Sequence, residues 1–189
     1  MTGKESDIEK IVAGCLQNDR ASQRQLYDRY AADMFWVCRR YSDSVEEAED
    51  ILMEGFMKVF KRLDTFRGES SLKSWITKVM INAAISHFRN SARLRMEVPT
   101  EDMDLMVGMD VEDHITTTLQ VEQVLELVKQ MPKGMQVVFN LRAVDEWEFS
   151  DIAKMLNKKE NAIRNTYMRA RRFLMEQLRL DEAENRTFQ

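Results

Sequence analysis

The side chains best suited to a chemical role lie near the C-terminal end of this 189-residue chain. One predicted helix carries, on the face opposite its apolar residues, a group that could contact nucleic-acid bases: Arg164, Asn165, Met168 and Arg169. Arginine can donate two hydrogen bonds to guanine and asparagine can pair with adenine, so this face could read base edges. Arg171 and Arg172 are better placed for phosphates, which set the register of a complex without reading its sequence.

The segments around this group match a helix-turn-helix plan. Ser150 is expected to cap a short helix that carries Ala153, whose small side chain suits a close helix crossing. The turn Asn157-Lys158-Lys159 follows, and Asn157 can take the left-handed conformation usually given to Gly. In this plan the second, Arg-rich helix enters the major groove. The alternative is an ordinary pair of helices with a solvated basic face.

Charge is segregated along the chain, although the formal net charge is only −4. Nine basic residues face two acidic ones between Lys58 and Arg95, and seven face two between Asn157 and Arg179. The segment from Glu97 to Glu126 lies between them, with nine acidic residues and no Lys or Arg. Clustered like charges attract a polyanion whatever the net charge is, so the two basic blocks favour nucleic-acid binding. Either block alone could instead be a solvated helix face.

The composition favours an all-α protein and gives little material for catalysis. Six Gly and two Pro are few, which argues against turn-dense β-sandwiches and Gly-rich phosphate loops. Two cysteines and two histidines (Cys15, Cys38, His87 and His114) make neither a disulfide framework nor a zinc site, so we expect buried thiols, no metal and no cofactor. No window approaches the ~20 apolar residues of a membrane span, and no secretory signal precedes the first helix, so a cytoplasmic location is expected.

Helical periodicity predicts two helical domains joined by a flexible acidic linker. The predicted helices of the first domain cover approximately residues 8–16, 21–41, 45–63 and 72–90. Ser70 or Ser71 is expected to cap the last of these helices. Within that helix, Trp75 falls on the apolar stripe and is expected in the core. The periodicity is lost from about residue 94 to 118, and the second domain covers residues 119–180.

Two motifs in the first domain and an ordered set in the second carry a family resemblance. Residues 48–56 read AEDILMEGF and residues 66–76 read FRGESSLKSWI, followed by Asn82 and Arg89. The second domain contributes Met131-Pro132, Val138-Phe139, Leu141, Ile152-Ala153, Leu156, Ile163 and Arg169-Ala170-Arg171. Over residues 8–179 the chain resembles the extracytoplasmic-function (ECF) sigma factors, with their region 2 over residues 8–93, a linker over 94–118 and their region 4 over 119–180.

The resemblance implies a promoter-specificity subunit that binds core RNA polymerase and has no catalytic activity of its own. Region 2 of the family docks on the clamp helices of the largest polymerase subunit, which makes the acidic residues Glu47, Asp50 and Glu54 candidate contacts; region 4 would meet the polymerase flap. Family members are commonly held inactive by an anti-sigma protein. We therefore expect core polymerase, promoter DNA and an anti-sigma factor as partners, and a monomer when the chain is free.

Two DNA elements would be read. The loop over residues 66–71 and the helix after it resemble the part that melts the minus-10 element, with Asn82 at the base-reading position. There Lys73, Lys78 and Arg89 could hold phosphates of the separated strand. The face around Arg164 and Arg169 matches the minus-35 readers of the family.

The sequence departs from the family pattern near the turn. Lys158 and Lys159 stand where an aliphatic residue and Ser are usual, Ala162 replaces a usual Thr, and Thr166 replaces a usual Arg. The missing hydroxyls predict a weaker N-cap and altered phosphate contacts. The alternatives to a sigma factor are a free-standing helix-turn-helix regulator and a helical scaffold or anti-factor that binds protein only.

Overall fold

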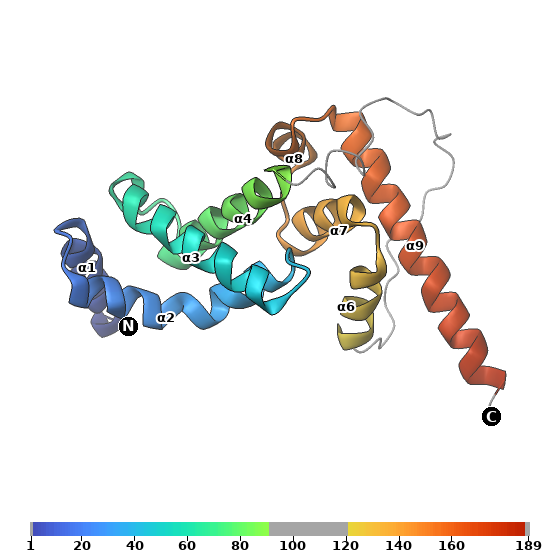
Figure 1. Ribbon diagram of the computed structural model, residues 1–189, viewed down its shortest axis with the longest axis horizontal. Coiled ribbons are helices and arrows are strands. Elements are labelled where there is room, and N and C mark those ends of the chain that lie inside the picture. The colour runs from blue at the N-terminus through green and yellow to red at the C-terminus, as the bar shows by residue number, and fades with distance from the viewer. Residues whose placement is uncertain (1, 91–120, 188–189) are drawn as a thin grey trace. The chain divides into compact units, whose positions relative to one another are not determined.

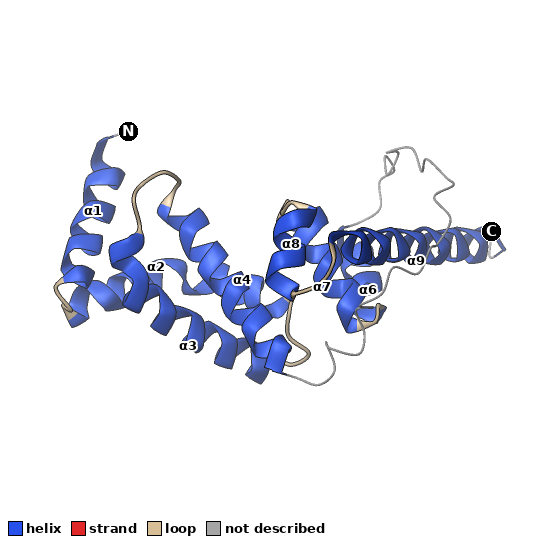
Figure 2. Ribbon diagram, turned by 90° about the horizontal axis from the view of Figure 1, so that it is seen from above, coloured by secondary structure: helices blue, strands red, loops and turns tan. Residues whose placement is uncertain are grey.

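The computed structural model describes residues 2–90 and 121–187, and within these ranges the chain forms helices and no strands (Figures 1 and 2). The chain divides into two compact units, with the boundary after Asn90. The expected all-α class is therefore confirmed for the described parts. The linker predicted over residues 94–118 lies outside the described residues.

The first unit is a bundle of four α-helices. Its elements are α1 (Thr2–Leu16), α2 (Arg20–Arg39), α3 (Val45–Arg62), the short 3-10 helix η1 (Leu63–Thr65) and α4 (Leu72–Asn90). The helix α3 packs against both α2 and α4, and α1 packs on α2 (Figure 1). The bounds of α2, α3 and α4 agree with the predicted ranges within one or two residues, whereas α1 begins earlier than expected.

Side-chain caps explain where three of these helices begin. Asp19 accepts hydrogen bonds from the backbone N–H groups of Ala21 and Ser22 before α2, and Ser44 accepts one from Glu47 before α3. The pKa of the Asp19 carboxyl is lowered, mainly by the hydrogen bond from the Ser22 side chain and next by the one from the Ser22 backbone N–H. Ser71, one of two serines predicted as the cap of α4, accepts a hydrogen bond from the Ser74 N–H at 3.1 Å. Each cap satisfies a donor that the first helical turn leaves unpaired.

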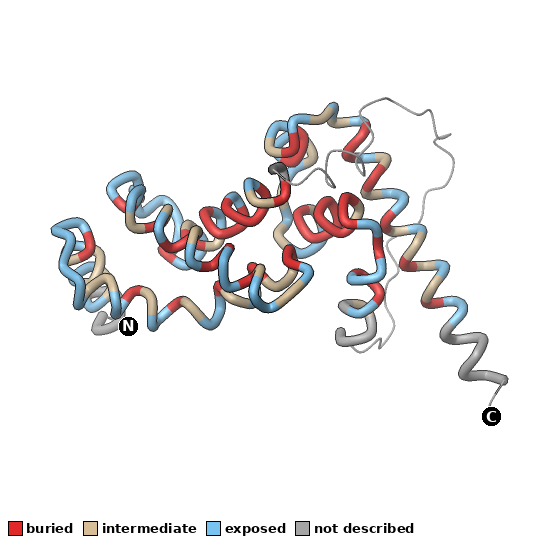
Figure 3. Tube along the Cα trace, in the orientation of Figure 1, coloured by how far each residue is buried: buried red, intermediate tan, exposed pale blue. Residues whose placement is uncertain are grey.

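The core of the first unit lies where the apolar stripes of α2, α3 and α4 meet (Figure 3). Its largest fully buried side chains on these helices are Leu26, Met34, Ile51, Ile76, Met80, Ile81 and Ile85. Burying each such side chain contributes about 1.5–3 kcal/mol to stability. Both cysteines are free and buried, as predicted, and burial raises the pKa of the Cys38 thiol to about 12.

The prediction that Trp75 lies in the core is wrong. The indole is only half-buried, and its ring packs against Phe66 from the preceding loop, with the ring centroids 5.7 Å apart. The buried positions on this side of α4 are Leu72, Ile76 and Val79. Trp75 precedes Ile76 and therefore lies at the edge of the apolar stripe of α4. Its ring covers the loop that contains Phe66 and does not enter the core.

The second unit places a long C-terminal helix against a set of short helices. Its elements are α6 (Val121–Gln130), α7 (Lys133–Phe139), the π-helical segment η2 (Asn140–Val144), α8 (Phe149–Leu156) and α9 (Glu160–Thr187). The helices α6, α7 and α8 each pack on α9. Buried side chains from α6, α7 and α9, including Leu127, Phe139 and Leu174, form one cluster.

Two details of the predicted helix-turn-helix can be compared with the structure. Asn157 has φ 54° and ψ 52°, so it takes the left-handed conformation as expected, and its N–H bonds the carbonyl groups of Ala153 and Lys154 at the end of α8. The prediction that Ser150 caps α8 is wrong, because the helix begins at Phe149 and Glu148 occupies the cap position without a side-chain hydrogen bond.

Gly55 allows the close approach of α3 and α4, and this contact can be tested. A Cβ atom at Gly55 would overlap the buried sulfur of Met80, so Gly55→Ala should lower the free energy of unfolding by about 1–3 kcal/mol in urea titrations followed by circular dichroism. Met80→Ala removes the overlapping atoms, so the double variant should lose less stability than the sum of the single variants. Additive losses would contradict this role for Gly55.

Candidate nucleic-acid interface

The predicted base-reading group lies together on the first turns of α9. Arg164 and Arg169 are exposed, Met168 keeps 42% of its surface exposed, and Asn165 is half-buried. The opposite side of the helix is buried through Ile163 and Ala170. Arg172 is exposed and Arg171 half-buried one turn further along the helix. Packing of α9 on the rest of the unit therefore determines which of its side chains face solvent.

Arg164 has two partners that the sequence analysis did not single out, Glu160 and Phe149. Its Nε and Nη2 atoms donate to one carboxylate oxygen of Glu160 at 3.0 and 2.6 Å. Its guanidinium carbon lies 4.5 Å from the ring centroid of Phe149, and that of Arg142 lies 5.0 Å from the same ring. The spacing of Glu160 and Arg164, four residues apart on one helix, could have indicated the ion pair. The ring contacts join separate elements, and no local pattern indicates them.

The exposed side of α4 carries the second basic group. Lys73 forms an ion pair at 2.5 Å with Asp33 of α2, so a cation expected to face nucleic acid is paired within the unit. Lys78 and Asn82 are exposed, and the Asn82 amide nitrogen donates to the Lys78 carbonyl at 2.7 Å. Arg89 lies in α4, but its side chain is outside the described residues. The loop before α4 is exposed from Arg67 to Ser71.

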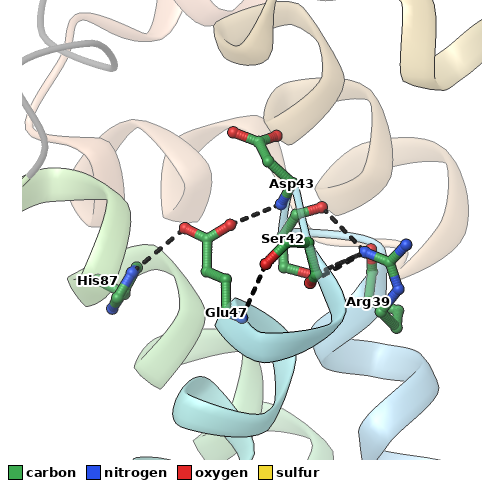
Figure 4. Close-up of polar contacts among 6 residues, drawn as sticks. Arg39, Ser42, Asp43, Glu47 and His87 are labelled. Carbon is green, nitrogen blue, oxygen red and sulfur yellow. Dashed lines mark hydrogen bonds and ion pairs between the residues drawn. The ribbon is translucent and has the colours of Figure 1, made fainter.

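The three predicted acidic contacts on α3 differ in their surroundings. Asp50 is exposed, and Glu54 pairs with Lys58 at 2.6 Å. The carboxylate of Glu47 lies between two partners, accepting a hydrogen bond from the Asp43 N–H at 2.6 Å and lying 3.2 Å from His87 Nε2 (Figure 4). Glu47 therefore ties the start of α3 to α4, whereas Asp50 is open to solvent.

The same side of α3 carries two apolar side chains that the sequence analysis missed. Met53 and Met57 are 57% and 64% exposed, and they alternate along the helix with Asp50 and Glu54. Exposed methionines adapt their shape to a partner surface, which suits a protein interface. The signal that could have found them is the four-residue spacing of two methionines outside the apolar stripe.

Other kinds of site find little support in the described part of the chain. No group of three His, Cys, Asp or Glu residues there could hold a metal ion. No helix among those residues is long and apolar enough to cross a membrane.

Comparison with known proteins decides the family. Residues 26–94 match the Sigma-70 region 2 family and residues 121–174 the Sigma-70 region 4 family, which together make up more than half of the chain. The RNA polymerase sigma-H factor of Pseudomonas aeruginosa is 25% identical over 180 residues, which are 90% of this chain and 93% of that protein. The ECF RNA polymerase sigma factor SigW of Bacillus subtilis is 24% identical over 181 residues, 91% and 97% of the two chains.

The chain belongs to the ECF sigma factors. Sigma factors of this family direct RNA polymerase to promoters. Among solved structures, the sigma factor RpoE of Bartonella quintana, crystallised with the anti-sigma factor NepR, is similar with a TM-score of 0.51 and 21% identity over 84% of this chain and 97% of that one. This similarity shows a shared fold.

The departures of this sigma factor from the family pattern now have positions in the structure. Ala162 and Thr166 are both 2% exposed, and the Thr166 hydroxyl donates to the Ala162 carbonyl at 2.8 Å. Both substitutions are therefore on the packed side of α9. Lys159 precedes α9, and its carbonyl accepts the Ile163 N–H at 3.2 Å. A lysine side chain has no hydrogen-bond acceptor, and the weaker cap stays a prediction.

Proposed function

We propose that this sigma factor binds core RNA polymerase through the exposed side of α3 and reads promoter DNA with α4 and α9, without catalysing a reaction itself. The observation that carries the proposal is the sorting of charge onto exposed helical sides: acidic on α3 as far as Glu54, basic on α4 and on the first turns of α9. Both basic sides fall within the residues that match the two sigma-70 regions.

At the minus-10 element, the loop over residues 66–71 and α4 would receive a base extruded from the stack. Unstacking a base costs a few kcal/mol, which contacts to the extruded base must recover. Asn82 is exposed in the middle of α4 and offers an amide to such a base. Lys73, Lys78 and Arg89 would hold backbone phosphates, and at Lys73 a phosphate competes with the Asp33 carboxylate for the ammonium group.

At the minus-35 element, α9 would enter the major groove with Arg164, Asn165, Met168 and Arg169 toward the bases. Arg171 and Arg172 would contact phosphates on the flanking backbone. Tethering both units to one polymerase raises the effective concentration of each at its DNA element, so two modest contacts can give a tight complex.

Docking on polymerase would use the clamp helices of the largest subunit for α3 and the flap for the second unit. Asp50 and Glu54 supply negative charge toward a basic partner surface, and Met53 and Met57 supply apolar contact beside them. Glu47 would contribute at the edge of this surface, where His87 and the Asp43 N–H fix its carboxylate.

An anti-sigma factor is a further proposed partner. The similar structure of RpoE contains the anti-sigma factor NepR, and this supports a protein of that kind for the present chain. We place the chain in the cytoplasm, as a monomer when it is free. An anti-sigma factor bound to it would keep it from polymerase.

Reconstitution tests the proposed function directly. The purified chain, mixed with core polymerase and a library of promoter fragments, should give transcripts that begin at defined sites and depend on the added chain. Binding to duplex DNA without polymerase, and no transcripts with it, would instead indicate a free-standing helix-turn-helix regulator. A chain that neither binds DNA nor gives transcripts with polymerase would be a protein-binding scaffold.

Charge reversal on α3 should weaken polymerase binding. Asp50→Lys removes an exposed negative charge from the proposed docking side, so the affinity for core polymerase should fall about tenfold in low salt and less in high salt. Asp28→Lys makes the same change on the exposed side of α2 and serves as the control. Equal effects of the two variants would contradict a specific contact at Asp50.

Removal of the Asn82 amide should impair strand opening more than recruitment. Asn82→Ala removes the proposed base contact, so permanganate reactivity of the opened minus-10 region should fall while closed-complex affinity changes little. Ser86→Ala is the matched control, because Ser86 also hydrogen-bonds the backbone of α4 four residues back, at 2.7 Å. Unchanged permanganate footprints for Asn82→Ala would count against the assigned role.

Arg169 and Arg172 should respond differently to truncation. Arg169→Ala should cost about 1–3 kcal/mol at the specific promoter and less on unrelated sequences, if its guanidinium is bidentate to guanine. Arg172→Ala should weaken binding to all sequences alike, because a phosphate contact carries no sequence information. A uniform loss for Arg169→Ala would refute base reading by that residue.

A further inference from the structure

Phe149 is the first residue of α8, and its ring lies next to the first turns of α9. Its ring has the guanidinium group of Arg164 at 4.5 Å and that of Arg142 at 5.0 Å. A guanidinium over an aromatic face gains an electrostatic attraction and loses rotational freedom. An arginine side chain without such contacts is mobile, whereas the side chain of Arg164 is held in place before any DNA binds.

The ring itself is fixed from two directions. On the core side, Phe149 packs edge-on against Tyr167 at 5.5 Å, and Tyr167 stacks on the buried Phe139 at 6.2 Å. On the other side, Arg142 Nη1 donates to the Trp147 carbonyl at 3.1 Å, which ties η2 to the segment that leads into α8. The orientation of the Phe149 ring therefore depends on the fold of the unit and not on the ligand.

Glu160 restrains the same guanidinium from the side. One of its oxygens accepts from both Nε and Nη2 of Arg164, which uses the side edge of the guanidinium. The end edge, made of Nη1 and the second hydrogen of Nη2, is not used by Glu160. That edge has the parallel pair of donors that matches the O6 and N7 acceptors of guanine.

We propose that Phe149 and Glu160 are positioning residues that hold Arg164 ready to read one guanine of the minus-35 element, which rests on the proposed reading of DNA by α9. A restrained arginine loses less rotamer freedom on binding, so more of its hydrogen-bond energy appears as affinity for the correct base. Glu160 also brings a negative charge close to DNA, and this lowers binding to sequences that offer Arg164 no guanine.

The test uses polymerase holoenzyme assembled with variants of the full chain. Competition binding with every single-base change in the minus-35 element, for the natural chain and Arg164→Ala, identifies the base pair that Arg164 reads. At that base pair, Phe149→Leu and Glu160→Gln should each reduce discrimination about threefold to tenfold, the size expected for one cation–π or charge-assisted contact. Glu160→Gln should also raise binding to unrelated DNA.

Three comparisons separate positioning from loss of structure. Phe149→Tyr keeps the aromatic face and should keep discrimination. Leu178→Ala creates a cavity further along α9 and should lower the melting temperature without changing discrimination at that base pair. In an Arg164→Ala background, Phe149→Leu should have no further effect on discrimination, because it acts through Arg164.

Two results would overturn the inference in distinguishable ways. If Arg164→Ala abolishes discrimination at a base pair and Phe149→Leu and Glu160→Gln do not change it, Arg164 reads DNA without positioning by these residues. If Arg164→Ala changes no base preference, the positioning role fails together with the assignment of Arg164 as a reader. Promoter-dependent initiation by the natural chain, measured separately, reports on the sigma-factor function itself.

Discussion

Burial of apolar stripes between paired helices determines which side of each helix is left for other contacts. In the first unit α3 contacts both α2 and α4, and Gly55 lets it approach Met80 of α4 closely. This packing leaves only one side of α3 for acidic residues and methionines, and one side of α4 for lysines and Asn82. The proposed polymerase and DNA contacts therefore occupy the sides of helices that the core does not use.

In the second unit, the turn at Asn157 and the burial of one side of α9 together determine which side chains face solvent. The left-handed Asn157 ends α8 and allows the chain to turn into α9, whose buried side packs on α6, α7 and α8. The exposed side then carries Arg164 and Arg169, and an aromatic series from Phe139 through Tyr167 to Phe149 connects Arg164 with the core. Base-reading side chains on a helix are thereby supported by contacts from other elements, which a helix alone could not supply.

Local sequence predicted what local interactions determine. The apolar stripe of α3, the turn at Asn157 and a cap at Ser70 or Ser71 depend on residues within one or two helical turns, and the sequence predicted each of them. Ser150 was not a cap because the chain path before α8, held by the bond from the Trp147 N–H to the Leu141 carbonyl, makes Glu148 the last non-helical residue. The Lys73–Asp33 pair and the Phe66–Trp75 contact depend on packing between separate segments, and no spacing along the chain encodes them.

The buried cysteines have a consequence for how this protein could respond to its environment. Thiols react with oxidants as thiolates, and burial raises the pKa of Cys15 and of Cys38, the latter to about 12. At neutral pH almost no thiolate exists at Cys38, and the side chain is 0% exposed. Peroxide or disulfide stress would therefore leave Cys38 of the folded chain chemically unchanged.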